Sequence, residues 1–352
     1  MQNFKILTAL CILLVIQSCS TDFELNADWK EVTAMYSILD QSQERQYVRL
    51  TKAYLGEGSA LEMAQEADSL YFQNATVQLR GYSGSNLVET IDLTKVDAAN
   101  VSVDFHPEKE EGVFVHNPYF VYHTDASLDA SYTYEVAVNT DKDNEVTAKT
   151  SLVSDFDLIT PTNNDDINWL STNKQIKWKK ASNAGIYGLD IILTYREYAN
   201  NETDESQYET KQVVYPIFSN LKDEDELSPI MEFDFDPNLF FSYIAQSIGE
   251  EGAENYKRIF RRLEYTYYAG NDDFTRYFDV ATANRTGLGN SGQAQPIYNN
   301  IESGEGVGLV AARFSKTIEV NVPPSSLDEL ICGDFTKNLR FVRFIDQAIN
   351  CP

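Results

Sequence analysis

A hydrophobic period of two is the feature that most restricts the fold of this sequence. Apolar and aromatic residues recur at every second position of residues 187–195, and residues 132–138 and 146–152 alternate in the same way. Successive side chains of an extended strand point to opposite faces, so this pattern predicts strands with one buried face. The polar residues 141–144 predict a hairpin turn between the last two segments. Strands are also predicted at 32–38, 46–55, 75–80, 87–93, 176–178, 263–267 and 274–280.

These strands predict a mainly β protein of two sandwich domains. Pro161 and the polar residues 163–166 mark the boundary between them. We expect an immunoglobulin-like or transthyretin-like sandwich over residues 31–157 and a fibronectin-III-like sandwich over residues 158–352. The second sandwich would end in a strand and a tail bounded by cysteines.

Three local features refine this prediction. A capping box at Ser59 and Glu62 predicts a short helix over residues 59–68. The pair Asp236–Pro237 has the form of a helix start, and we expect a helical insertion over residues 236–262. Trp178 is expected to be buried against the strand at 187–195, as in a fibronectin type III sandwich.

The amino terminus carries the longest apolar run, Ile6–Ile16, directly after Lys5. Eleven residues are too few to span a bilayer, which needs about 20, but they suit the apolar region of a secretory signal. The run ends in Ile16-Gln17-Ser18-Cys19, which resembles a bacterial lipobox. The resemblance implies a signal peptide at residues 1–18, acylation of Cys19 and a tether at residues 19–30. An ordinary signal peptide or an uncleaved anchor is the alternative.

Charge and cysteine content exclude several classes of partner. The formal net charge is −26, and Lys and Arg form no cluster, which argues against nucleic acid and against a basic membrane-binding patch. With Cys11 in the signal and Cys19 acylated, Cys332 and Cys351 remain. In an exported chain this pair predicts a disulfide, and a loop of about 20 residues would contribute roughly 3 kcal/mol. A metal site at these cysteines is disfavoured because no histidine lies near them.

The candidate metal ligands have unsuitable spacing. The three histidines, His106, His116 and His123, are ten and seven residues apart, which fits neither one helix face nor a tight strand pair. Acidic residues at 141–145 imitate the start of a calcium loop but lack its glycine and its distal glutamate, so a hairpin turn explains them better. The acidic run 223–226 is interpreted as a solvated loop. We therefore predict no metal and no cofactor.

No catalytic constellation stands out either. The chain has 54 Asp and Glu residues, and nothing selects two of them as a glycosidase pair. The serines beside Gly84 lie in an expected β turn rather than in a nucleophile elbow. Tyr and Phe total 40, which leaves sugar binding open, although such residues first fill β cores. We predict a protein that is not an enzyme and name no catalytic residue.

One short motif suggests a modification. Asp68-Ser69-Leu70 resembles the Asp-Ser/Thr-aliphatic acceptor used for O-glycosylation in Bacteroidota. The resemblance implies that Ser69 carries a glycan. A buried position near a helix end is the alternative.

Several longer stretches together resemble one family. They are the lipobox, EVTAKTSLV, ITP, IKWKKASNAGIYGLDIILTY and PIYNNIESGEGVGLVAARF. Their order is similar to that in an uncharacterised, domain-of-unknown-function family of Bacteroidota lipoproteins (DUF4249-like). The most specific part is Asn300, Ile301, Gly304 and Gly306, where the glycines predict a tight turn before a terminal strand.

The resemblance implies a function through location. Members look like outer-membrane lipoproteins and are associated with TonB-dependent receptors, which would make this chain a non-enzymatic accessory to nutrient uptake. Asp22 and Glu24 close to the anchor favour the cell surface, with the periplasmic face left open. A free-standing adhesin or glycan-binding module is the alternative, and a hydrolase is a third reading. The ligand, whether a small molecule or a glycan, is not specified by the sequence.

Overall fold

The computed structural model describes residues 30–55, 60–98, 112–140, 145–169, 174–223, 227–285, 297–347 and 351. In these residues the chain is mainly β, as predicted, with a large mixed sheet and a small second sheet. The strands are β1 (Lys30–Asp40), β2 (Gln46–Leu55), β3 (Ala75–Ser83), β4 (Asn86–Asp97), β5 (Phe120–Thr124), β6 (Thr133–Thr140), β7 (Glu145–Ser151), β8 (Leu158–Thr160), β9 (Lys174–Lys179), β10 (Ile186–Ala199), β11 (Glu209–Lys222), β12 (Ile230–Phe235), β13 (Tyr256–Gly270), β14 (Gly306–Val320) and β15 (Phe341–Val342). The helices are α2 (Ala60–Ala64), α3 (Ala67–Leu70), α4 (Pro237–Ile248), α5 (Asp272–Arg285) and α6 (Pro324–Cys332), with 3₁₀ turns at Ala253–Asn255 and Lys337–Leu339.

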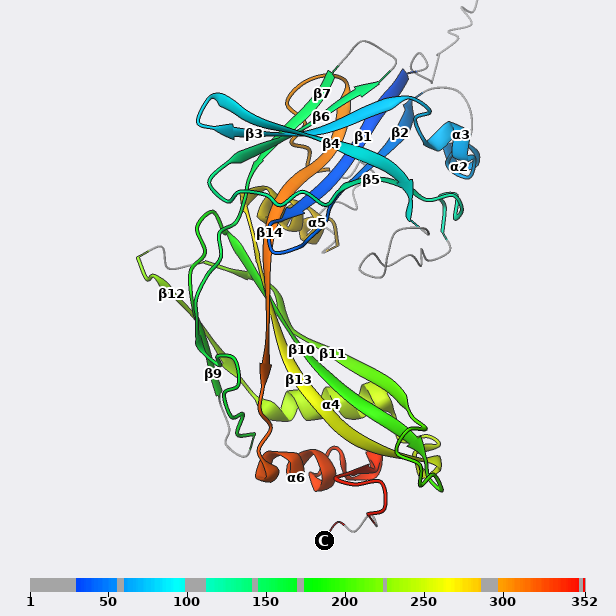
Figure 1. Ribbon diagram of the computed structural model, residues 1–352, viewed down its shortest axis with the longest axis vertical. Helices are drawn as coiled ribbons and strands as arrows, with labels where there is room; N and C mark the ends of the chain where they lie inside the picture. The colour runs from blue at the N-terminus through cyan, green and yellow to red at the C-terminus, as the bar shows by residue number, and fades with distance from the viewer. Residues whose placement is uncertain are drawn as a thin grey trace, which may run out of the picture.

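One long strand, β14, joins the two halves of the molecule. The large sheet has the order β11-β10-β13-β14-β1-β2-β5-β4-β3-β6-β7. The first half of β14 pairs in parallel with β1, and the second half pairs antiparallel with β13. Arg313 is in register with both Asp40 at the end of β1 and Gly270 at the end of β13. Figure 1 shows β14 running from the upper group of strands into the lower group.

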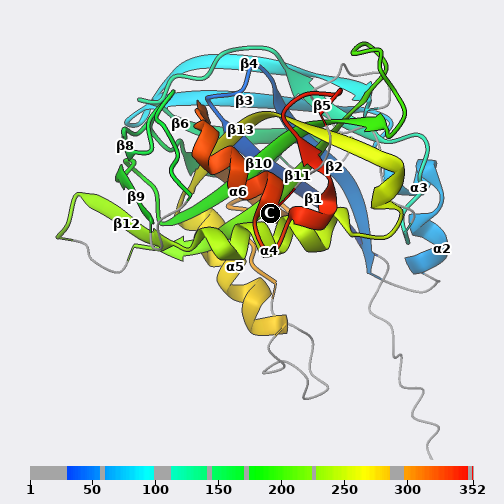
Figure 2. The same ribbon diagram turned by 90° about the horizontal axis from the view of Figure 1, so that it is seen from below.

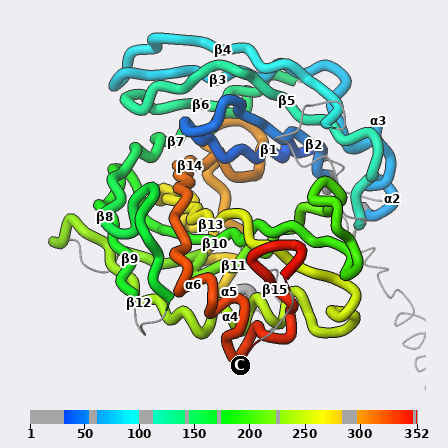
Figure 3. Tube along the Cα trace, turned by 60° about the horizontal axis from the view of Figure 1, so that its bottom comes forward, coloured from blue at the N-terminus to red at the C-terminus, as the bar shows by residue number. Residues whose placement is uncertain are grey.

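The upper group curls back on itself. Figure 3 shows β3, β4 and β6 arching over β1 and β2. The final strand in the sheet order, β7, lies next to the segment that leads into β14. Thr147 of β7 forms an isolated β-bridge with Ser303, just before β14 begins. Alternate residues of β1 and β2, among them Met35 and Leu50, are buried in the core inside this curl. The opposite faces of the two strands point outward.

The lower group is a two-layer arrangement around Trp178. The small sheet, of order β12-β9-β8, places the fully buried indole against the large sheet. The indole lies 5.5 Å from the ring of Tyr187, 6.1 Å from Tyr267 and 5.8 Å from Phe218, measured between ring centroids. The prediction that Trp178 is buried against the strand at 187–195 is confirmed.

The helical insertion is shorter than predicted. Helix α4 starts as expected, with the Asp236 carboxylate accepting a hydrogen bond from the Asn238 amide. Figure 2 shows α4 and α6 in front of the lower strands when the molecule is seen from below. The continuation of the insertion to residue 262 is wrong, because β13 already begins at Tyr256 and pairs with β10. A buried ion pair between Arg258 and Glu197, 2.8 Å between Nε and Oε2, ties this part of β13 to β10.

The strand predicted at 274–280 is also wrong, because these residues lie in α5. Asn271 caps this helix, and its side-chain oxygen accepts a hydrogen bond from the Phe274 amide at 3.1 Å. Phe274 and Phe278, four residues apart, then meet edge to face on one side of the helix. The capping asparagine and this spacing were the helix signal in the sequence.

The predicted boundary near residue 158 stays a prediction. The structure adds that β14, from the C-terminal part of the chain, completes the sheet of the N-terminal part. No helix among the described residues is long and apolar enough to cross a membrane.

Candidate functional site

The residues singled out from the sequence do not converge on one place. Cys19 and His106 lie outside the described residues. His123 lies in β5, with its Nδ1 atom 3.6 Å from Asp125. Within the described ranges, no group of three His, Cys, Asp or Glu side chains is placed to hold a metal ion. Ser69 lies half-buried in α3, and its glycosylation stays a prediction.

The carboxyl-terminal cysteines are joined. Cys332, the last residue of α6, forms a disulfide with Cys351, and their Cα atoms are 5.2 Å apart. The bond fastens the end of the chain to α6. It lies in the lower half of the molecule, at the opposite end from α2 and α3 (Figure 1).

The glycine-containing segment before β14 has a structural role. The Asn300 side chain donates to the Val310 carbonyl at 2.7 Å and accepts from its amide at 2.9 Å. Gly304 has a φ of +77°, and a Cβ atom there would lie 2.6 Å from the Glu145 carbonyl oxygen. The predicted tight turn is therefore present, and it docks on β7.

A cavity of about 500 Å³ lies on the outer face of β1 and β2, and we call it the β1–β2 cavity. Its floor follows from the register of three neighbouring strands. Ala34 of β1 lies between Thr51 of β2 and Val307 of β14, and in the next row Tyr36 pairs with Arg49. The small side chains of the first row leave the floor hollow.

Helices α2 and α3 and the loop at residues 113–114 form the wall over this floor. They contribute apolar side chains, namely Leu61, Met63, Ala64, Leu70, Val113 and Phe114. The loop is held to α2 by a hydrogen bond from the Val115 amide to the Ala64 carbonyl, 2.8 Å long. Figure 1 shows α2 and α3 beside β2. The single helix predicted at 59–68 is thus two short helices, and the Ser59 of its capping box lies outside the described residues.

Two cations from β2 line the cavity, Arg49 and Lys52. The Arg49 guanidinium lies 5.5 Å from the ring centroid of Phe114 and 5.9 Å from that of Tyr119. Its Nε atom is buried and has no hydrogen-bond partner among the residues that the structure describes. The Lys52 Nζ atom lies 3.8 Å from Oε2 of Glu31.

A third cation, Lys95, raises the positive potential at this end of β2. Burial, and then the positive charge of Lys52, lower the pKa of Lys95 below its ordinary value. Its ammonium donates to the Phe72 carbonyl at 2.6 Å. The β1–β2 cavity therefore has two cations in its lining and a third nearby, although the chain as a whole is strongly acidic.

A smaller cavity, of about 200 Å³, lies where β14 changes partner, and we call it the junction cavity. Asp190, Tyr268 and Arg313 line it together with aromatic side chains of α5 and β11. Burial raises the pKa of Asp190, and a hydrogen bond from Tyr268 partly offsets that effect. The site is small and holds charges of both signs.

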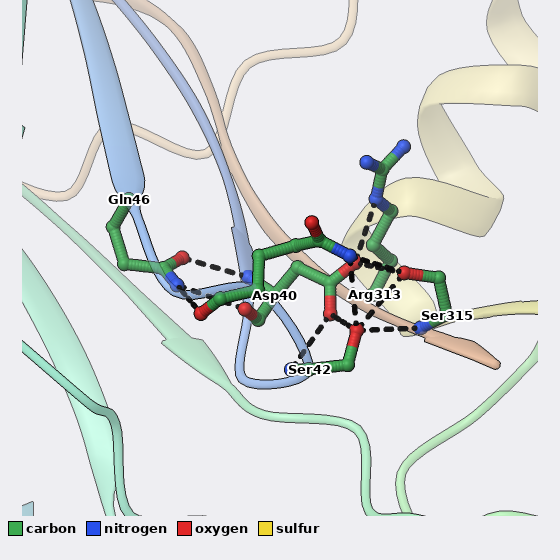
Figure 4. A network of polar contacts seen from close by, with 6 residues as sticks. Asp40, Ser42, Gln46, Arg313 and Ser315 are labelled. Atoms are coloured by element: carbon green, nitrogen blue, oxygen red, sulfur yellow. Dashed lines mark hydrogen bonds and ion pairs between the residues drawn. The ribbon is translucent and has the colours of Figure 1, made fainter. Parts of the chain in front are cut away.

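A polar network fixes the edge of the junction cavity (Figure 4). The buried Asp40 carboxylate accepts from Arg313 Nε at 3.0 Å, from Ser315 Oγ at 2.7 Å and from Ser42 Oγ at 2.5 Å. The Gln46 side chain binds both the amide and the carbonyl of Asp40, at 2.9 and 2.8 Å. The network therefore locks the β1–β2 turn onto β14.

Sequence reasoning missed both cavities. Alternation placed Tyr36 and Arg49 on strands but did not show that they share an outer face with Val307, more than 250 residues away along the chain. An arginine in an alternating strand is the one local signal, and a solvated surface explains it equally well.

Comparison with known proteins gives no assignment. No protein-family model matches the chain, and no curated protein matches it. A crystal structure of trypsin-activated α-2-macroglobulin from Escherichia coli aligns with a TM-score of 0.18 and 9% identity, covering 68% of this chain and 14% of that chain. A crystal structure of CBD12 from CALX1.2 aligns with a TM-score of 0.15 and 8% identity, covering 83% of this chain and 99% of that chain. Neither alignment supports an argument about function.

Proposed function

We propose that this chain is a non-enzymatic, lipid-anchored binding component of the outer membrane that works with a TonB-dependent transporter in nutrient uptake. The observation that carries the binding role is the β1–β2 cavity. Its volume of about 500 Å³ lies within the range of small-molecule sites, which is roughly 300–1,000 Å³. Its walls are mainly apolar with a few polar groups, as expected of a site that holds a ligand.

The proposed lipid anchor and transporter partner are inferred from the sequence and not from the β1–β2 cavity. Anchoring rests on the lipobox at Cys19, and the transporter rests on the family resemblance. A tether from Cys19 to Lys30 has eleven peptide links, which span at most roughly 40 Å. Because β1 follows the tether directly, the β1–β2 cavity would stay close to the membrane surface, within reach of a transporter.

A mild crosslink of native cells, followed by pull-down of this protein and mass spectrometry, tests the proposal. We expect a TonB-dependent receptor in stoichiometric amount. The matched control is a strain that expresses the chain with Cys19→Ala, in which the receptor should be lost. If no outer-membrane partner is captured and the protein binds a carbohydrate array, the free-standing glycan-binding module replaces this proposal.

A further inference from the structure

We propose that the β1–β2 cavity binds an amphipathic monoanion, a molecule with one carboxylate and an apolar body. The inference takes from the proposed function only the idea that this cavity is a ligand site. Its chemical class is argued from the walls of the cavity and from Arg49, whose charge has no carboxylate partner in the described part of the chain.

The rim of the cavity is unusually apolar for a water-exposed surface. Leu61, Val113, Phe114 and Tyr36 are exposed to 61, 47, 45 and 40%. They come from three separate segments of the chain, yet they surround the same hollow. Contiguous exposed apolar surface of this kind marks a binding site. An apolar ligand body would cover it and remove it from water.

Arg49 specifies the polar end of the ligand. Among the described residues, no carboxylate lies within ion-pair distance of its guanidinium, although the chain carries 54 acids against 28 Lys and Arg. Its positive charge rests instead on the faces of Phe114 and Tyr119. The buried Nε atom lacks an acceptor, and a donor left without a partner is costly. Protein atoms cover Nε, so a ligand carboxylate in the cavity would pair with the remaining part of the guanidinium, which lines the cavity.

The neighbouring charges favour a single negative charge. Of the two cations that line the cavity, Lys52 has Glu31 as a partner, with Nζ 3.8 Å from Oε2, and Arg49 has no carboxylate partner among the described residues. The second charge of a dianion would have to pair with Lys52, whose charge Glu31 already offsets. A glycan would need several hydrogen-bonding groups in the floor of the cavity. The floor side chains are small and mostly apolar, and Thr51 is the hydroxyl-bearing side chain in the first row.

Isothermal titration calorimetry tests the proposal on the full chain carrying Cys19→Ala, so that no acyl chain of the protein competes. The probe is decanoate below its micellar concentration, compared with decan-1-ol and decylamine. We expect decanoate to bind one to one and decylamine to bind at least tenfold more weakly. Arg49→Gln should weaken decanoate binding by about 10- to 100-fold and remove the preference for decanoate over decanol. Arg49→Lys should retain part of that preference.

Arg196→Gln is the matched control. Arg196 lies over the ring of Tyr208 at 4.0 Å, so it is also an arginine stacked on an aromatic ring, but in the lower half of the molecule. Its substitution should leave decanoate binding unchanged, and circular dichroism melting checks that each variant folds.

Three results would overturn the ligand class. The first is that decanoate does not bind. The second is that the parent protein and the Arg49→Gln variant bind decanoate with equal affinity. The third is that the parent protein binds decanol as tightly as decanoate. A dimer in solution that excludes decanoate would assign the apolar rim to a second copy and would also overturn it. If the receptor is still captured from cells in any of these cases, the proposed function stands and only its ligand changes.

Discussion

Asp40 is predicted to be the polar residue that contributes most to holding β14 onto the upper strands. Its carboxylate is 4% exposed and accepts four hydrogen bonds, from Arg313, Ser315 and twice from Ser42. Asp40→Ala removes all four. A hydrogen bond to a charged group contributes about 1.5–3 kcal/mol to the free energy of unfolding. Because Arg313 is 40% exposed and the two serines reach water, these donors bond to water in the variant, and most of the free energy of the lost hydrogen bonds is recovered. We expect a decrease of about 2–3 kcal/mol in the free energy of unfolding.

Urea unfolding followed by tryptophan fluorescence and by far-ultraviolet circular dichroism measures this decrease. The control is Asp125→Ala, because Asp125 also pairs with an arginine, Arg45, but is 60% exposed. Exposed pairs contribute little, so this variant should unfold at the urea concentration of the parent. Equal stability of the two variants would refute the reasoning from burial.

The number of transitions is a second result of the same experiment. Because β14 pairs with β1 and β13 together, the two halves of the sheet should unfold in one transition seen by both probes. Two separate transitions in the parent protein would show that β14 does not couple the halves.

Three further predictions concern a buried carboxylate, the disulfide and the lipid anchor. Because burial raises the pKa of Asp190, stability should fall as pH rises from its unfolded pKa through its folded pKa. Asp190→Asn should therefore raise the melting temperature at pH 7 and have no such effect below pH about 3.8, and an equal effect at both pH values would contradict the burial argument. Replacing both Cys332 and Cys351 by serine should lower stability by about 3 kcal/mol, since the disulfide closes a loop with a sequence separation of 19; a non-reducing peptide map that shows two free thiols would remove the premise. Cys19→Ala should abolish anchoring, and a variant that remains with membranes after a carbonate wash would refute the lipobox interpretation.

Strands with strict alternation were predictable because their burial pattern is local. The hairpin β6–β7 and the strands β9 and β10 appear where periodicity places them. β11 was not predicted, because the apolar residues at its centre are consecutive, do not alternate with polar ones and include a proline. Its Pro216 is tolerated since a terminal strand has one side without a partner strand.

The two errors have different origins: a tertiary contact decided one segment, and a local capping signal was overlooked in the other. Residues 256–262 are extended because β10 supplies a partner strand and Glu197 supplies the counter-ion of Arg258. Residues 274–280 are helical because Asn271 caps them, and its side chain also donates to Thr150 in the upper group at 2.7 Å. That second contact joins segments about 120 residues apart and has no signature in the local sequence.

The β1–β2 cavity could be predicted from the sequence only in part. Outward-facing residues of β1 and β2 follow from alternation. The parallel pairing of β1 with β14 does not, because no turn or loop length fixes a contact across more than 250 residues. The hollow floor and the position of Arg49 in the lining become visible only once that register is known.

A crystal structure with 10-bromodecanoate tests the central claim most directly, because anomalous scattering locates the bromine atom independently of the protein coordinates. We predict one bromine site among the apolar side chains of α2, α3 and the loop at 113–114, with the carboxylate bonded to Arg49. A bromine site elsewhere, or none at saturating ligand, would contradict the account.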